Sequence, residues 1–308
     1  MKAVITGPTG AIGIALVKEL ISNNAEVLAI CHRGSKRIGH LSVDPHVHIL
    51  ELDLSEYASY QPDMTQKDYD IFYHFAWNGT TGAARNDMYM QHANIGYALD
   101  AAALAKRMGC HTFIGAGSQA EYGRTECKLN ADVPTFPENG YGMAKLAAGQ
   151  MTRILCEQLG IKHIWTRILS VYGPGDGAAS MIMMTIRKLL DGEVPQLTKG
   201  EQRWDYLYSG DAARAMALLA AKGINGKTYC IGSGQTRCLS EYMEMMRDAV
   251  NPMAEMAIGA VPYSEKQVMY LCADIEELTH DTGFRPEVSP IDGIRETVAW
   301  MRDSSQNF

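Results

Sequence analysis

The sequence predicts an α/β fold, in which a doubly wound parallel sheet is followed by a smaller carboxyl-terminal α/β lobe. Short apolar runs alternate with longer segments of helical periodicity through the first half of the chain, which is the rhythm of βαβ units. A glycine-rich turn follows the first apolar run and opens the first helical segment. After residue 175 the alternation loosens, which predicts a smaller unit folded over the carboxyl ends of the strands, where open α/β sheets bind ligands.

Each element follows from its own stretch of sequence. The expected strands are short apolar runs at residues 3–6, 26–31, 46–52, 71–76, 112–116 and 163–170. Segments with apolar residues at helical spacing, residues 11–22, 90–108 and 141–159, supply crossover helices. Because parallel strands need such crossovers, this order predicts one parallel sheet. Later, residues 239–250 and 291–301 predict helices, and the methionine-rich run 181–184 predicts core or pocket lining.

The composition is that of a globular chain, with 46% hydrophobic and 20% charged residues among 308. The net charge of -7 argues against a nucleic-acid partner, because affinity for phosphate backbones comes from clustered Lys and Arg. The amino-terminal residues lack the apolar stretch of a signal peptide, and no later run of about 18 apolar residues predicts a membrane span. We therefore expect a cytoplasmic protein without membrane contact.

The cysteines and histidines do not form a recognisable ligand set. The seven cysteines are scattered and include no C-x-x-C pair, which favours reduced, mostly buried thiols over a disulfide framework or a zinc site. The nine histidines include no H-E-x-x-H motif. We predict that the protein binds no metal.

A phosphate-binding loop is predicted at the first strand-to-helix turn, residues 7–13, where the sequence reads Gly-Pro-Thr-Gly-Ala-Ile-Gly. Gly7 permits the tight turn, Gly10 lets the backbone approach a pyrophosphate, and Gly13 lets the helix pack on the strand. A glycine-rich turn without a ligand is the alternative, but the flanking strand and helix favour dinucleotide binding. The loop residues expected at the cofactor are Gly7, Thr9, Gly10, Ala11, Ile12 and Gly13.

This loop divides the chain by function. We expect residues 1–172 to form a dinucleotide-binding (Rossmann) domain, to which residues 204–234 return. Residues 173–203 and 235–308 are expected to form mainly the substrate-binding lobe. We therefore expect the substrate-binding lobe to close over the cofactor site.

A catalytic pair is predicted on the helix at residues 141–159. Lys145 follows Tyr141 by one helical turn, so both side chains project from one helix face. A phenol is a weak acid or base near neutrality, and an adjacent ammonium is expected to lower its pKa. The same spacing also occurs on ordinary surface helices, so the pair alone does not establish catalysis.

The glycine spacing and this Tyr-Lys pair resemble those of short-chain dehydrogenases. Ser118, in the run Gly-Ser-Gln-Ala-Glu-Tyr-Gly, stands where the family has a Ser or Thr that hydrogen-bonds the reacting oxygen. The resemblance spans nearly the whole chain and is to the extended type, the NAD-dependent epimerase/dehydratase family that acts on nucleotide sugars. It implies catalytic roles for Ser118, Tyr141 and Lys145, with Lys145 also holding the nicotinamide ribose.

The resemblance also implies further cofactor contacts. Asp53 and Leu54 resemble an adenine-binding pair, and Asn94 resembles a residue that braces the loop of the neighbouring strand. The residues expected along the cofactor ribose are Phe75, Ala76 and Trp77. After the second strand no acidic residue is present to accept a ribose 2′-hydroxyl bond, and Arg33, Lys36 and Arg37 follow. This basic end favours NADP, with NAD as the alternative.

Substrate contacts are implied by resemblance at Ser118, Gln119, Ser170 and Arg203. Many relatives carry Asn where Ser170 stands, and Arg where Trp204 follows Arg203. The substrate implied is a nucleoside-diphosphate sugar, and relatives often form homodimers through the helices after the fourth and fifth strands.

The expected reaction is hydride transfer at a sugar carbon, with Tyr141 as acid or base. Related 4,6-dehydratases have an Asp-Glu pair after the Ser/Thr, but this chain has Gln119 and Ala120, which cannot shuttle a proton. We expect a reductase of a 4-keto(-6-deoxy) nucleotide sugar, with an epimerase that keeps its cofactor as the alternative. Two other hypotheses are reduction of a non-sugar ketone and a non-catalytic dinucleotide-binding sensor or scaffold.

Overall fold

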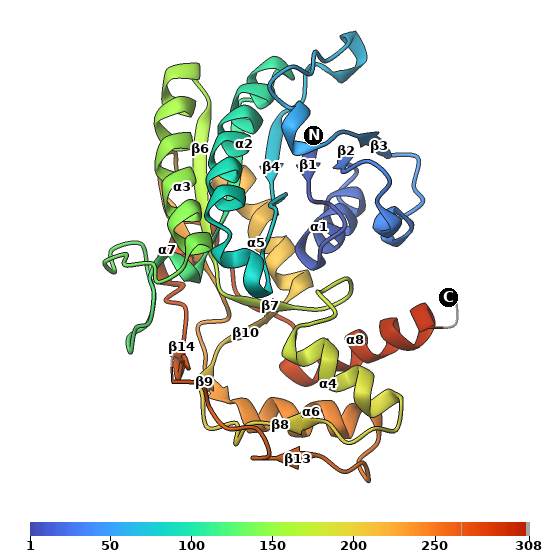
Figure 1. The fold of residues 1–308 in the computed structure, drawn as a ribbon. Helices are drawn as coiled ribbons and strands as arrows, with labels where there is room; N and C mark the ends of the chain where they lie inside the picture. Colours follow the sequence, from blue (N-terminus) through green and yellow to red (C-terminus); the bar gives the residue numbers. More distant parts are fainter. Residues whose placement is uncertain (266, 306–308) are drawn as a thin grey trace.

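The computed structural model describes residues 1–265 and 267–305 and contains a seven-stranded parallel sheet in the order β11-β6-β5-β4-β1-β2-β3 (Figure 1). The chain runs outward from β1 through β2 to β3, then returns to the other side of β1 with β4 and runs outward through β5 and β6. The strands are β1 (Lys2–Thr6), β2 (Glu26–Cys31), β3 (Val47–Glu51), β4 (Ile71–His74), β5 (Thr112–Ser118), β6 (Lys162–Ile168) and β11 (Thr228–Ile231).

The strand order reverses between β1 and β4, so the loops that follow these two strands diverge. A crevice at such a switch point is where doubly wound sheets bind their ligands. The predicted fold class, a Rossmann-type parallel sheet, is confirmed.

Helices cover both faces of the sheet. α1 (Ala11–Ser22) packs with α5 (Ser209–Lys222) on one face, and α2 (Met88–Arg107) packs with α3 (Gly140–Leu159) on the other. Side chains of β1 alternate between the two resulting cores: Ala3 and Ile5 join the α1/α5 side, and Val4 joins the α2 side. Burial on both faces explains why the inner strands β1, β2, β4 and β5 are mostly apolar runs, whereas the edge strand β3 is largely exposed.

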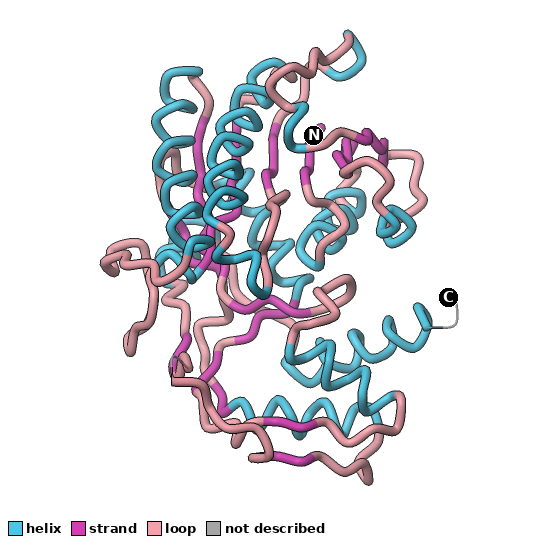
Figure 2. The backbone as a smooth tube through the Cα atoms, in the orientation of Figure 1, coloured by secondary structure: helices cyan, strands magenta, loops and turns pink. Residues whose placement is uncertain are grey.

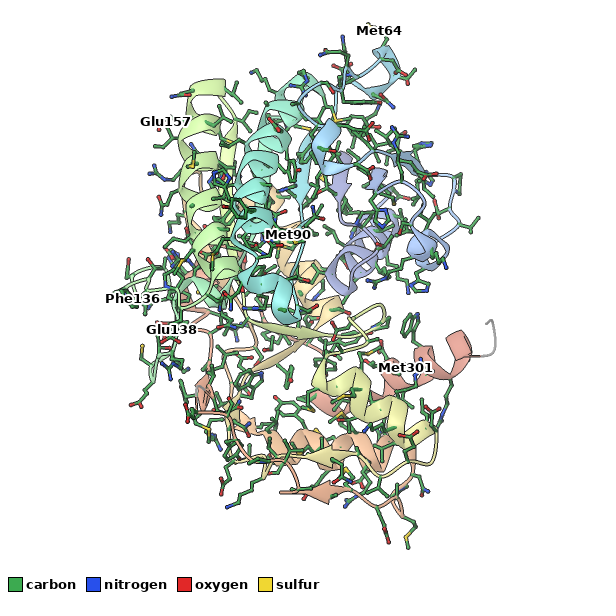
Figure 3. The ribbon with its side chains drawn as sticks, viewed as in Figure 1. Met64, Met90, Phe136, Glu138, Glu157 and Met301 are labelled. Carbon is green, nitrogen blue, oxygen red and sulfur yellow. The ribbon has the colours of Figure 1, made fainter. Side chains whose placement is uncertain are left out.

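The smaller lobe lies below the carboxyl ends of the strands in the views of Figures 1 and 2. Its core joins three helices, and Met301 of α8, labelled in Figure 3, is buried there. The helices are α4 (Met181–Leu190), α6 (Leu239–Val250) and α8 (Pro290–Ser305), with α7 (Glu276–Thr282) outside this core. The short strands are β7 (Ser170–Tyr172), β8 (Gln196–Leu197), β9 (Arg203–Trp204), β10 (Tyr206–Tyr208), β12 (Arg237–Cys238), β13 (Ala257–Ile258) and β14 (Tyr270–Leu271).

The structure differs from the expected elements at the edge of the sheet. The strand expected at residues 163–170 ends at Ile168; the N–H of Leu169 still bonds to the carbonyl of Ile231 at the end of β11, and the chain then leaves the sheet. Residues 170–172 instead pair with β10 in a separate two-stranded sheet. The seventh strand, β11, is a four-residue segment that pairs with β6 and that the periodicity did not single out.

Short 3-10 helices occupy several loops: η1 (Lys36–His40), η2 (Leu54–Glu56), η3 (Met64–Gln66), η4 (Gly82–Asn86) and η5 (Gln119–Glu121). All five lie in connections that follow strands of the large sheet. No helix in the described part of the chain is long and apolar enough to cross a membrane.

Candidate active site

A cleft of about 600 Å³ lies at the carboxyl ends of β1 to β4. Its lining includes eight of the residues predicted to contact a cofactor, namely Gly7, Thr9, Gly10, Asp53, Leu54, Phe75, Ala76 and Trp77. Other predicted residues lie outside the lining: Ala11, Ile12 and Gly13 are in the first turn of α1, Arg33 follows β2, and Asn94, Tyr141 and Lys145 are on α2 and α3.

The glycine loop has the shape that an extended phosphate chain requires. Gly7 has a φ of +69°, and a Cβ at this position would lie 2.8 Å from the backbone nitrogen of Ala76. A Cβ on Gly13 would lie 2.5 Å from the carbonyl oxygen of Gly7. A Cβ on Gly10, by contrast, would meet only that oxygen, at 3.8 Å, so the backbone before α1 is bare on its open side. Bare backbone at a helix amino end fits the pyrophosphate of a dinucleotide.

Polar side chains hold the loop after β4 in place. The side chain of Asn94 accepts a hydrogen bond from the backbone nitrogen of Asn78 (3.1 Å) and donates one to its carbonyl oxygen (2.9 Å). Gln91 accepts a hydrogen bond from the indole of Trp77 at 2.9 Å. Asn94 therefore holds the loop after β4 from a buried position on α2.

Acidic side chains from other segments lie around the end of β2, although the residues that directly follow this strand include no acidic one. Glu56 binds the Arg33 guanidinium through both oxygens at 2.9 and 3.0 Å, and Asp53 accepts a hydrogen bond from the Arg33 backbone nitrogen. Glu51 accepts one from the backbone nitrogen of Gly34. Arg37 donates to the carbonyl oxygen of Gly175. Neither Arg33 nor Arg37 lines the cleft, whereas Asp53 does.

Ser118, Tyr141 and Lys145 are brought together where β5 ends against α3. The Ser118 side chain shares a hydrogen bond with the Tyr141 hydroxyl. The Lys145 ammonium donates to the carbonyl oxygen of Ala116 at 2.6 Å and lies 3.7 Å from the ring centroid of Trp77. Asn139 begins α3 by accepting a hydrogen bond from the backbone nitrogen of Gly142 at 2.8 Å, which fixes the turn that carries Tyr141.

The expected direction of the Tyr141 pKa is wrong. Burial raises the pKa of Tyr141, and the hydrogen bond from Ser118 and the positive charge of Arg85 oppose that rise without cancelling it. Burial also lowers the pKa of Lys145 to about 7, with the negative charge of Glu121 acting against it. The ammonium was expected to dominate, but desolvation of both groups dominates instead.

Arg85 and Glu121 are site residues that the sequence did not predict. The Arg85 guanidinium carbon lies 4.4 Å from the ring centroid of Tyr141. Glu121 is fully buried beneath Ser118 and is paired with Arg167 at 2.8 Å. Its position three residues after Ser118, the spacing of a capping box, is a signal in the sequence that could have identified it. Arg85 lies in η4, before α2, and gave no such signal.

The expected substrate residues are dispersed. Gln119 follows Ser118 directly in η5. The Ser170 hydroxyl accepts a hydrogen bond from the indole of Trp204 at 2.9 Å. Arg203 is exposed on β9 and donates to the carbonyl and hydroxyl oxygens of Thr236, both at 3.2 Å, so its described contacts lie within the lobe. The described residues contain no group of three or more His, Cys, Asp or Glu side chains placed to hold a metal.

Comparison with known proteins gives consistent results. A model of the NAD dependent epimerase/dehydratase family matches residues 3–232. A dTDP-glucose 4,6-dehydratase of Actinoplanes sp. is 26% identical over 98% of both chains. A dTDP-4-dehydro-6-deoxyglucose reductase of Escherichia coli is 28% identical over 63% of this chain and 62% of its own.

Solved structures agree with the family match at the level of the fold. The crystal structure of a UDP-glucuronic acid 4-epimerase from Bacillus cereus in complex with NAD superimposes with a TM-score of 0.86, at 20% identity and over 100% of this chain and 99% of that one. The resemblance inferred from the glycine loop and the Ser-Tyr-Lys set is thereby confirmed. The chain is an enzyme of the NAD-dependent epimerase/dehydratase family, the extended short-chain dehydrogenases that act on nucleotide sugars.

Proposed function

We propose that this enzyme reduces the 4-keto group of a nucleoside-diphosphate (6-deoxy)sugar. The observation that carries the proposal is the cluster of Ser118, Tyr141 and Lys145 beside Trp77, which lines the cofactor cleft. A bound nicotinamide dinucleotide supplies the hydride. The glycine loop, Asp53, Leu54 and the loop after β4 are the residues proposed to hold that cofactor.

Residues of the chain itself carry out the proton transfer. Tyr141 donates its phenolic proton to the carbonyl oxygen as charge develops there, and the Ser118 hydroxyl orients that oxygen. A pKa of about 7 means that Lys145 is populated in both protonation states near neutrality. The ammonium form stabilises the phenolate that Tyr141 becomes, and Arg85 adds a second positive charge over the same ring.

Dehydration is disfavoured by the surroundings of Ser118. Gln119 and Ala120 provide no acid or base, and the nearest carboxylate, Glu121, already accepts hydrogen bonds from Ser118, Trp165 and Arg167. A carboxylate held in this way is not free to remove a proton from a substrate. Reduction and epimerisation both use only the Tyr141 proton and the hydride, so these reactions are the ones that the site supports.

The cofactor preference is revised from NADP to NAD. The predicted preference depended on Arg33, Lys36 and Arg37, none of which lines the cleft. The cleft lining contains Asp53 but no Lys or Arg that could pair with a 2′-phosphate. Titration with NADH and NADPH tests this point, and tighter binding of NADPH would restore the first preference.

The substrate side is proposed by resemblance and by position. Gln119 follows Ser118 directly in the chain, and we propose that it contacts the sugar. Ser170 and Arg203 are proposed to bind the diphosphate, which a guanidinium can grip in a bidentate manner. A thermal-shift panel of UDP, dTDP, CDP and GDP identifies the base. If no nucleoside diphosphate binds, the non-sugar ketone hypothesis replaces the sugar hypothesis.

We also propose a homodimer formed through α2 and α3. These helices expose apolar side chains, namely Met88, Tyr89, Met143, Met151 and Ile154. Such residues on neighbouring helices are typical of an interface. Light scattering after size exclusion tests this, and a monomer at micromolar concentration contradicts it.

One experiment separates the candidate reactions. The purified enzyme is incubated with NADH or NADPH and nucleotide 4-keto-6-deoxysugars, and absorbance of the nicotinamide and sugar product are followed together. The expected result is net oxidation of NADH or NADPH together with formation of a 4-hydroxy sugar. In a parallel incubation without added NADH or NADPH the enzyme is given 4-hydroxy nucleotide sugars, and formation of their C4 epimers without net change of the nicotinamide overturns the reductase in favour of an epimerase. Tight dinucleotide binding without any turnover supports the sensor or scaffold hypothesis.

A further inference from the structure

We propose that Glu121 is a positioning residue of the active site, which fixes the backbone of Ser118 and keeps a negative charge behind Lys145. This inference depends on the roles proposed above for Ser118, Tyr141 and Lys145. It adds a residue that does not touch the cleft but acts on two residues of the proposed catalytic set.

The contacts of the Glu121 carboxylate show how it fixes Ser118. One oxygen accepts hydrogen bonds from the backbone nitrogen of Ser118 at 2.9 Å and from the indole of Trp165 at 3.0 Å. The other accepts from the Arg167 guanidinium at 2.8 Å. The Ser118 hydroxyl in turn accepts a hydrogen bond from the backbone nitrogen of Ala120 at 3.2 Å. Ser118 is thus held from its backbone and from its side chain.

This ion pair is costly to bury, so its retention needs a reason. Both partners are almost inaccessible, with side chains 0% exposed for Glu121 and 6% for Arg167. A buried ion pair contributes little to stability compared with apolar residues of similar volume. The backbone also makes room for it, because a Cβ on Gly117 would clash with the Glu121 carboxylate. A role in the site accounts for a pair that packing alone does not favour.

The second role is electrostatic. The groups that face Lys145 are Glu121 from η5, Tyr141 from its own helix and His74 from β4. Burial and the charge of Lys145 lower the pKa of His74 to about 3, so this imidazole is neutral near pH 7. Glu121 raises the pKa of Lys145 against the effect of burial. Without that carboxylate, Lys145 loses its proton at lower pH.

The pairing with Arg167 acts against the effect of burial on the Glu121 carboxyl. Burial raises the pKa of Glu121, and the charge of Arg167 and the three N–H donors oppose that rise. Arg167 is always protonated, so a neutral Glu121 would leave a buried guanidinium without a counter-charge. The pairing with Arg167 therefore favours the carboxylate form of Glu121, which is the form whose charge acts on Lys145.

The test compares Glu121→Gln with a matched control. Asp211→Asn, on α5, also neutralises a buried carboxylate that accepts backbone N–H groups and pairs with an arginine, Arg214, at 2.9 Å. For Glu121→Gln we expect kcat at pH 7 to fall about 100-fold, the effect typical of a misplaced catalytic group. We also expect the alkaline limb of the kcat profile to move to lower pH. Asp211→Asn is expected to keep the wild-type profile.

A second measurement needs no substrate. The titration of the Lys145 side chain is followed by NMR of labelled lysine, assigned with Lys145→Arg, in wild type and in Glu121→Gln. We expect the variant to titrate at lower pH. If wild type turns over none of the nucleotide sugars, the proposed function fails while this titration still tests Glu121.

The inference is overturned if Lys145 titrates alike in both proteins, or if Glu121→Gln lowers kcat by the same factor at every pH. Where Glu121→Gln does not fold because Arg167 is left unpaired, the double variant Glu121→Gln/Arg167→Gln removes both charges and leaves two amides that can bond to each other. The same two measurements and the same two outcomes apply to it.

Discussion

Replacing Lys145 by methionine is expected to stabilise the protein in a pH-dependent way while it abolishes turnover. The side chain is 3% exposed, and burial lowers the pKa of its ammonium from 10.5 to about 7. Between these two values the unfolded chain binds more protons than the folded chain. The stability of the wild type therefore rises with pH through that window. The free-energy cost of burying the Lys145 ammonium is complete below pH 7 and absent above pH 10.5.

The magnitude follows from the two pKa values. One pKa unit corresponds to about 1.4 kcal/mol, so the penalty is about 4 kcal/mol at pH 7 and about 2 kcal/mol at pH 9. Methionine removes that dependence but also removes the hydrogen bond to Ala116 and the contact with Trp77. Those losses shift the comparison equally at both pH values. The stability difference between variant and wild type should therefore shrink by about 2 kcal/mol from pH 7 to pH 9.

Urea unfolding at both pH values, with wild type and variant side by side, measures this difference. Because every other titrating group is common to the two proteins, its contribution cancels. Lys18→Met, on the exposed side of α1, gives the baseline for losing an exposed lysine. A stability difference that is the same at pH 7 and pH 9 would refute the lowered pKa of Lys145, and with it the proposal that both protonation states of Lys145 are populated near neutrality.

Three further predictions concern the cleft and the proton donor. Tyr141→Phe should lower kcat by about 100- to 10,000-fold, because it removes the acid, and should leave dinucleotide affinity unchanged in a fluorescence titration; near-normal turnover contradicts its role. Asn94→Ala removes two hydrogen bonds to the backbone of Asn78, so it should weaken dinucleotide binding and lower the free energy of unfolding in urea by about 1 to 3 kcal/mol. An unchanged dinucleotide affinity would show that binding does not depend on these two hydrogen bonds. Arg33→Ala should leave the affinities for NADH and NADPH nearly unchanged, since the guanidinium is held by Glu56 outside the cleft; a selective loss of NADPH affinity contradicts the preference for NAD.

The parts of the fold that the sequence predicted are those governed by local pattern. Continuous apolar runs and the glycine turn located the first six strands and α1, because a strand buried on both faces has no polar positions to obscure it. The edge strand β11 was missed because four residues carry too little periodicity. The exit of the chain after Leu169 was missed because residues 170–172 pair with β10, which is distant in sequence.

The site shows the same division between local pattern and long-range contact. Ser118, Tyr141 and Lys145 could be identified because each has a fixed spacing within its own segment. The surroundings of these residues could not, because Arg85, Glu121 and the pairing of Arg33 with Glu56 depend on contacts between elements. For that reason the sequence predicted the wrong direction for the Tyr141 pKa and a cofactor preference that the positions of the charges do not support.

The distance between β5 and α3 is set by a residue in neither element. A Cβ on Gly115 or Gly117 of β5 would clash with the indole of Trp165 on β6, and a Cβ on Gly149 of α3 would lie 2.6 Å from it. Glycine is unfavourable inside strands and helices, so three such residues around one indole indicate a close approach that the site requires. The three glycines therefore let α3, which carries Tyr141 and Lys145, approach β5, which ends at Ser118, with the Trp165 indole packed between them. Through its hydrogen bond to Glu121, the same indole also connects both elements to the buried carboxylate.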